Sequence, residues 1–174
     1  ILNCSQNWLS ELNLSKCTKL VRLECNDNYL STLNMSKCVK LEYLNCAENR
    51  IKALNLNKCV YLYDVYCSHN TIQSLKVAGC ARLSRLDCSS NRLSALSVKN
   101  CSLLKTLKCN SNQLSTLDVS GCSLLKEVDC YSNRLTSLDL NACTQLSRLF
   151  CERNQLTSLN ISGCTTLKNL SCYY

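Results

Sequence analysis

The sequence contains no proline and only three glycines in 174 residues. Linkers between domains are usually rich in proline, glycine or polar residues, so no boundary can be drawn along this chain. Charged residues make up 18% of the chain and hydrophobic residues 46%, which excludes a disordered composition. We therefore expect residues 1–174 to form a single domain.

Long apolar runs and catalytic motifs are missing too. No stretch of about 18 apolar residues is present, so we expect no membrane insertion. The single histidine, His69, lies near Cys67, but the sequence pattern points Cys67 inward and His69 outward, which argues against a nucleophile–base pair. Phosphate loops, HExxH and GxSxG are also absent. We expect no enzyme activity and no cofactor.

What the chain does have is one frame, LxxLxCxxNxL, which first appears complete at residues 20–30 and returns every 21 residues. A fixed period of this length predicts a solenoid, here of about eight repeats. Ile1 already lies inside a repeat and Tyr174 lies partway through another, so no capping repeat is evident. A fragment, a processed chain, a designed array and units that stack end to end all remain open.

Each repeat contains two apolar segments. In the first, leucine and cysteine alternate, as in Leu44 and Cys46, with the period of a strand that has one buried face. Stacking one such strand per repeat predicts a parallel sheet with about 4.8 Å between neighbours. The second segment, such as Leu54 and Leu56, predicts a second short strand or extended segment. About ten residues then remain, which leaves room for a single 3₁₀ turn but not for an α-helix.

An asparagine recurs at one position of every repeat. A stacked ladder of amides satisfies turn backbone groups within and between repeats, so we predict a structural role. The ladder comprises Asn28, Asn49, Asn70, Asn91, Asn112 and Asn133. At a different position, before the second cysteine, several repeats carry a residue that favours a left-handed backbone: Gly79, Asn100, Gly121 and Gly163.

Seventeen cysteines form two columns, nine in one and eight in the other. Because the number is odd and both columns occupy apolar positions, we predict buried free thiols. A cross-core disulfide such as Cys25 with Cys38 and a metal site are the alternatives. Zinc is poorly supported, since the chain has no CxxC and a single histidine, so we predict no metal. The first column includes Cys25, Cys46, Cys67, Cys88 and Cys109.

The frame resembles the leucine-rich repeat, and more narrowly the short 21-residue class of bacterial secreted and surface proteins. The resemblance covers essentially the whole chain. It implies a right-handed solenoid with little or no α-helix, whose first strands line a binding face. It also implies a role in protein recognition or adhesion, at the surface of a bacterium or after secretion.

The outward positions beside the first strands vary from repeat to repeat and mix aromatic and charged residues, which is typical of protein interfaces. We predict that a protein partner binds at Tyr43, Tyr66, Arg85, Asp87, Lys108, Asp129, Tyr131, Arg148 and Phe150.

Charge is balanced on this face, so the net charge of +8 comes from elsewhere. We expect the excess to be dispersed over the second strands and connecting turns: Lys16, Lys37, Lys58, Lys76, Lys99, Lys105 and Lys126. Dispersed lysine argues against nucleic-acid binding, which needs a concentrated stripe. Head-to-tail self-association through uncapped ends is the second functional hypothesis, and polyanion binding is the third.

Overall fold

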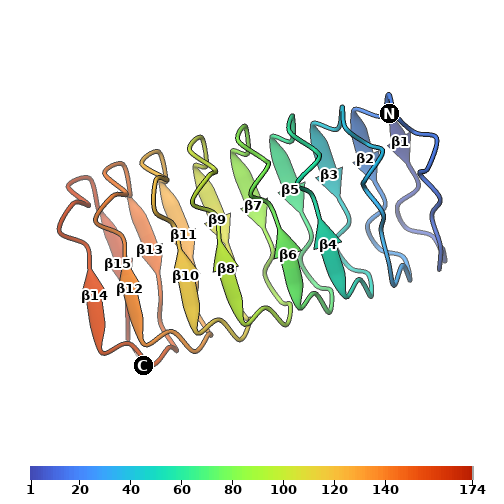
Figure 1. Cartoon of the computed structure of the whole chain (residues 1–174). Helices are drawn as coiled ribbons and strands as arrows, with labels where there is room; N and C mark the ends of the chain where they lie inside the picture. The colour runs from blue at the N-terminus through green and yellow to red at the C-terminus, as the bar shows by residue number, and fades with distance from the viewer. Residues whose placement is uncertain (174) are drawn as a thin grey trace.

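The computed structural model describes residues 1–173 and shows a solenoid built from one long parallel sheet and short strands on the opposite side (Figure 1). No residue in this range is helical. The sheet has nine strands in the order β1-β2-β3-β5-β7-β9-β11-β13-β15. They are β1 (Leu2–Asn3), β2 (Arg22–Glu24), β3 (Tyr43–Asn45), β5 (Asp64–Tyr66), β7 (Arg85–Asp87), β9 (Thr106–Lys108), β11 (Glu127–Asp129), β13 (Arg148–Phe150) and β15 (Asn169–Ser171).

The register of this sheet follows the repeat. Leu44 of β3 pairs with Leu23 of β2 on one side and with Val65 of β5 on the other, so paired residues are 21 positions apart. Residues at the same position in successive repeats are therefore neighbours in space. The predicted parallel sheet of one strand per repeat is confirmed.

The second extended segments pair only in twos. The short strands are β4 (Ala53–Asn55), β6 (Ser74–Lys76), β8 (Ala95–Ser97), β10 (Thr116–Asp118), β12 (Ser137–Asp139) and β14 (Ser158–Asn160). They form the pairs β4–β6, β8–β10 and β12–β14. The corresponding segments near residues 12 and 33 are not strands. The predicted second strand is thus present, but it does not build a continuous second sheet.

The connecting turns run from the end of each second segment to the next first strand. The single 3₁₀ turn that the sequence allows does not form there. Two successive β-turns take its place, as when Cys38 N–H donates to Met35 O (3.0 Å) and Leu41 N–H donates to Cys38 O (3.1 Å). Each turn supplies backbone hydrogen bonds over few residues, which suits the roughly ten residues available.

Left-handed backbone occurs at a position that the sequence analysis missed. Among Gly79, Asn100, Gly121 and Gly163, only Gly121 has a positive φ (81°), so that prediction is wrong for the other three. Positive φ is instead found just before the ladder asparagine, in a column that contains no glycine: Gln6, Asp27, Glu48, His69, Ser90, Ser111, Ser132 and Arg153. Hydrogen bonds between turns hold this conformation; Asp27 N–H, for example, donates to Ala47 O (3.0 Å).

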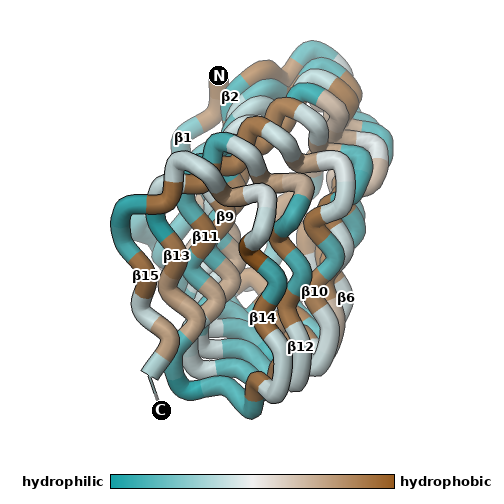
Figure 2. Tube along the Cα trace, turned by 90° about the vertical axis from the view of Figure 1, so that its left-hand side faces the viewer, coloured by the Kyte–Doolittle hydropathy of each residue, from teal (hydrophilic) through white to brown (hydrophobic). Residues whose placement is uncertain are grey.

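The core lies between the two strand layers, and Figure 2 shows apolar stretches recurring at the same places in successive turns. Leucines and cysteines of both segments fill it; Leu44, Cys46 and Leu56 are completely inaccessible to solvent. All seventeen cysteines are free thiols. Burial raises the pKa of the Cys67 and Cys88 thiols well above the ordinary value, which keeps them protonated at neutral pH.

Thiols of the second column also act as hydrogen-bond donors. Cys80 Sγ lies 3.4 Å from Leu56 O, and Cys122 Sγ lies 3.2 Å from Val98 O. In each case the acceptor belongs to the preceding repeat, 24 residues earlier in the chain. A small apolar side chain with a weak donor therefore fits this position better than a purely aliphatic one.

Candidate functional site

The candidate site is the outer surface of the nine-stranded sheet, which we call the first-strand face. In each of the strands β2, β3, β5, β7, β9, β11 and β13, the central residue points into the core and its two neighbours point outward; in β7, Leu86 is buried between Arg85 and Asp87. Because the strands are in parallel register, the outward residues form two rows. One row contains Tyr43, Asp64, Arg85, Thr106, Glu127 and Arg148, and the other contains Asn45, Tyr66, Asp87, Lys108, Asp129 and Phe150.

At its N-terminal end the face carries an aromatic cluster. The rings of Tyr43 and Tyr66 are tilted, with 5.7 Å between their centroids. The Arg22 guanidinium carbon lies 3.6 Å from the centroid of Tyr43, and Arg22 Nε donates to Glu24 Oε1 at 2.7 Å. Burial raises the pKa of Tyr43. These contacts hold the aromatic side chains in place, so a partner that binds here meets a largely ordered surface.

A pocket of about 220 Å³ lies at the centre of the face. Its lining comprises Tyr66, Arg85, Leu86, Asp87, Thr106, Lys108 and Glu127. Arg85 Nη1 lies 3.6 Å from Asp64 Oδ2, while Asp87 Oδ1 accepts a 2.6 Å hydrogen bond from Ser89 Oγ. One aromatic ring and charges of both signs therefore surround a single hollow.

The C-terminal part of the face is acidic and partly desolvated. Burial raises the pKa of Asp129 to about 6, and repulsion from Glu152 adds to the shift, whereas the backbone N–H of Tyr131 and the charge of Lys108 oppose it. Asp129 Oδ1 and Glu152 Oε2 are buried without a hydrogen-bond partner among residues 1–173. Arg148 is occupied by an ion pair with Glu127. Both residues are partly exposed, so the negative charge of their carboxylates favours a cationic group of a partner nearby.

The structure gathers only part of the predicted binding set. Tyr66, Arg85, Asp87 and Lys108 meet at the central pocket. Tyr131 lies beyond its strand, at the start of the asparagine turn, and neither Arg148 nor Phe150 lines the pocket.

Arg22, Asp64, Thr106 and Glu127 were not in the predicted set, although the first two contact predicted residues and the last two line the pocket. They occupy the same columns as the predicted residues. Choosing adjacent positions from neighbouring repeats, rather than the most characteristic side chains, would have found them.

The ladder asparagines lie along the turn that follows each first strand. Asn70 Nδ2 donates to Cys46 O (3.0 Å), Cys67 O (3.3 Å) and Ser68 O (3.1 Å). Its Oδ1 accepts the N–H of Ile51 at 2.9 Å. Each amide thus links its own turn to the preceding one. Its donors and its acceptor are used in stabilising the solenoid.

A second surface with a distinct charge is the edge formed by the connecting turns, at the top of Figure 1. The first four connecting turns carry the exposed cations Lys16, Lys19, Lys37, Lys40, Lys58 and Arg82. The later turns add Lys99, Lys105, Lys126 and Lys168. Glu42 is the single acidic residue in this set of turns. The lysines lie on the connecting turns and second strands as expected, but their charge is not dispersed. Stacking at a period of 21 gathers most of it along one edge, which we call the basic edge.

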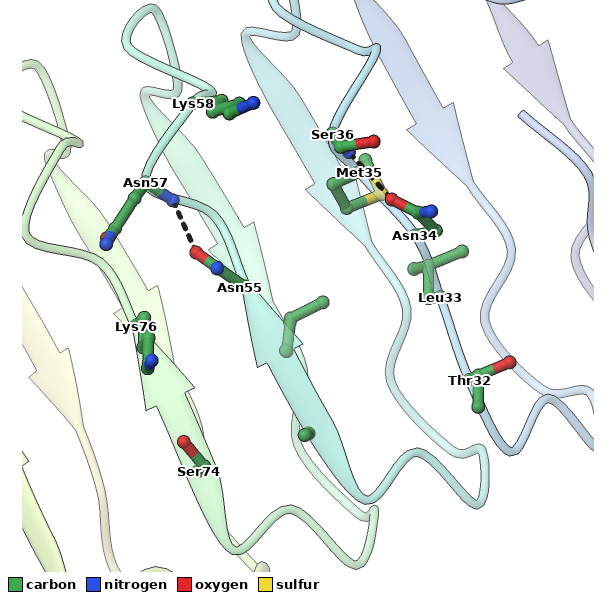
Figure 3. Close-up of a pocket in the computed structure, with 12 residues that line it drawn as sticks. Thr32, Leu33, Asn34, Met35, Ser36, Asn55, Asn57, Lys58, Ser74 and Lys76 are labelled. Atoms are coloured by element: carbon green, nitrogen blue, oxygen red, sulfur yellow. Dashed lines mark hydrogen bonds between the residues drawn. The ribbon is translucent and has the colours of Figure 1, made fainter. Parts of the chain in front are cut away.

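A larger hollow, of about 680 Å³, lies on the opposite side from the first-strand face (Figure 3). It opens where the segment around Asn34 does not pair with β4, and small polar residues such as Thr32 and Ser74 line much of it. Asn34 and Asn55 accept hydrogen bonds from Ser36 N–H (3.0 Å) and Asn57 N–H (3.2 Å), so both are held by their own turns. The hollow contains no aromatic residue, and we regard the smaller central pocket as the better binding site.

The described residues give little support for catalysis by a Cys–His pair or for metal binding. His69 is exposed, whereas Cys67 is buried in the core, so the two side chains face different surroundings. Residues 1–173 contain no group of three or more His, Cys, Asp or Glu side chains arranged to hold a metal ion. Within the same range there is no helix that could cross a membrane.

Comparison with solved structures shows what the fold is similar to. The functional domain of InlJ from Listeria monocytogenes, which includes a cysteine ladder, matches 95% of this chain with 36% sequence identity and a TM-score of 0.90. YopM from Yersinia enterocolitica matches 97% with 26% identity and a TM-score of 0.79. A leucine-rich repeat protein of Leptospira interrogans matches 98% with 24% identity and a TM-score of 0.84.

This chain spans 37%, 36% and 53% of those three structures, respectively. No protein-family model and no curated protein matches the sequence.

Proposed function

We propose that this chain, a leucine-rich repeat solenoid that resembles bacterial leucine-rich repeat proteins, is a non-enzymatic scaffold that binds a protein partner through its first-strand face. The observation that carries the proposal is the central pocket, which joins Tyr66, Arg85, Asp87 and Lys108 in one place. The similar solved structures are bacterial leucine-rich repeat proteins, and the role in protein recognition that this resemblance implies supports the same proposal.

The chemistry of the face suits a protein better than a small molecule or a polyanion. The pocket is small, and the aromatic pair Tyr43–Tyr66 extends the contact area beyond it. Aromatic and arginine side chains are the usual anchors of protein interfaces, and mixed charges select a partner with the opposite pattern. The carboxylates of Asp129 and Glu152 add negative charge that favours a basic group of the partner.

The test is a triple substitution of Tyr66, Lys108 and Phe150 by alanine. These side chains lie on the outer surface, so the thermal midpoint should change by no more than about 2 °C while partner binding is lost. A matched control replaces Lys76, Ser97 and Asn160, which are exposed on the second-strand side, by alanine.

Candidate partners are surface proteins that bind both to the immobilised parent chain and to the immobilised control variant. The affinity of each candidate for the parent chain, the control and the triple variant is then measured with purified components. A partner that binds the Tyr66, Lys108 and Phe150 variant with unaltered affinity would refute the assignment of this face.

We further propose a location on the surface of a bacterium or outside it, with a role in adhesion, and a single domain of about eight repeats. The internalin-like neighbour InlJ supports this location, and the resemblance of the repeat frame implies the role in adhesion.

The alternative function is a structural unit that assembles end to end. Trp8 in the first turn is 82% exposed and Leu170 in the last strand is 43% exposed, so both end turns present apolar side chains. Static light scattering at increasing concentration distinguishes the two functions. Growth of the mean mass with concentration favours assembly, whereas a constant monomer mass excludes it.

A further inference from the structure

The N-terminal half of the basic edge carries two parallel rows of cations. Lys16, Lys37 and Lys58 occupy the same position in three successive turns. Three residues further along in each turn are Lys19, Lys40, Tyr61 and Arg82, which form the second row. Because neighbouring turns of the solenoid are about 4.8 Å apart, the charges of the first row are closely spaced along a line. The second row follows the same spacing, with Tyr61 between its charges.

These charges are not neutralised within the described chain. All three ion pairs among residues 1–173 involve Arg22, Arg85 or Arg148, which belong to the first-strand face. The basic side chains of the two rows are all exposed. Like charges at this spacing repel one another, so an anionic ligand that binds several of them at once gains from relieving the repulsion.

Tyr61 lies within the second row, and its ring contacts the cations on either side of it. The Lys40 ammonium lies 5.7 Å from the centroid of its ring, and the Arg82 guanidinium lies 5.8 Å from it. Two cations from the turns on either side thus converge on one aromatic ring, which keeps the row continuous where a lysine is missing.

From this arrangement we propose that the basic edge binds a flexible, linear, phosphate-bearing polymer that lies along the solenoid axis. Such a chain repeats its negative charge along a line and can follow both rows of cations. This is a second binding activity, separate from protein recognition on the first-strand face.

Two other anionic partners fit less well. Single-stranded nucleic acid is bound by stacking its bases on successive aromatic rings, but only Tyr61 and Tyr63 lie on this edge. An anionic membrane would gain from inserted apolar side chains. The aliphatic residues between the cations here are the short Val39 and Val60, which are 40% and 46% exposed.

The probe is inorganic polyphosphate of defined chain length, with binding measured by calorimetry at several salt concentrations. We expect the logarithm of the affinity to fall linearly with the logarithm of the salt concentration. Replacing Lys16, Lys37 and Lys58 together by glutamine should lower the affinity about tenfold or more. The same change should reduce the salt slope by about 2, given about 0.7 per lost contact with a single-stranded chain.

The matched control replaces Arg50, Arg92 and Arg134 by glutamine. These exposed arginines share one position on the opposite, asparagine-turn edge, so the control removes the same charge from the molecule. Its affinity for polyphosphate should stay within about twofold of that of the parent chain. An unchanged thermal midpoint in both variants shows that the coil is intact.

Several results would overturn the proposal. Equal losses of polyphosphate affinity in the two variants would mean that net charge alone attracts the polymer. If the parent chain does not bind polyphosphate at all, the lysines have a role in solubility only. Tighter binding of single-stranded DNA than of polyphosphate would indicate a nucleic-acid site. Lysine-dependent binding to phosphatidylglycerol vesicles without binding of polyphosphate would indicate a membrane contact.

Discussion

The side chain of Asn91 shows how one residue holds two turns of the coil. Its Nδ2 donates to Cys67 O (3.0 Å), Cys88 O (3.1 Å) and Ser89 O (3.1 Å). Its Oδ1 accepts the N–H of Ile72 at 2.9 Å. No other side chain of this size offers two donors and an acceptor with this shape, which explains why the position is occupied by asparagine in every repeat.

Replacing Asn91 by alanine should therefore lower the free energy of unfolding by about 3 kcal/mol, because several buried backbone groups lose their partners at once. Urea unfolding followed by circular dichroism measures the loss. Asn100, which is exposed on a connecting turn, supplies the control, and its alanine variant should change stability by less than about 0.5 kcal/mol. Equal effects at the two positions would contradict a structural role for the ladder.

The connecting turn is the element in which successive repeats approach most closely. A Cβ atom built on Gly79 would fall well inside van der Waals contact with the carbonyl oxygen of Asn57 in the preceding turn. The same overlap exists between Gly163 and Asn141. Glycine is needed at these two positions because of this approach and not because of a left-handed backbone, since neither has a positive φ.

We expect alanine at position 79 to destabilise the protein by about 2 kcal/mol, the usual cost of forcing an extra group into a packed region. Ala142 occupies the corresponding position of the seventh connecting turn, so the reverse change Ala142→Gly is the control. The free energy of unfolding of that variant should fall by about 1 kcal/mol or less, because glycine only increases the conformational entropy of the unfolded chain. Denaturant unfolding compares the two, and a neutral Gly79→Ala would show that the turns can separate freely.

Across the whole molecule, burial protects the thiols. Fourteen of the seventeen cysteines are buried, Cys4 and Cys17 are partly exposed, and Cys172 is exposed. Burial raises the pKa of Cys25 to about 12, and the pKa of Cys59 to about 11, so the reactive thiolate is scarce near neutral pH.

An aromatic disulfide reagent should therefore modify at most about three thiols quickly in the native protein, and about seventeen in denaturant without reductant. Cys172→Ser should remove the fastest phase and leave the others unchanged. Recovery of close to one thiol per chain in denaturant would instead indicate disulfides across the core.

Sequence alone determined the coil. The 21-residue period, the alternation of leucine and cysteine and the recurring asparagine predicted the parallel sheet and the extended second segment, and both are present. These features could be read because each depends on a local pattern that every repeat carries in the same form.

The tertiary structure decided what depends on neighbours in adjacent turns. It set the pairing of the second strands in twos, the left-handed backbone at residues such as Glu48, and the meeting of Tyr66 with Lys108 at one pocket. It also gathered lysines that look scattered along the chain into one edge. The physical reason is the same in each case: stacking brings residues 21 positions apart to within about 5 Å, so their contacts, charges and backbone hydrogen bonds are shared between turns.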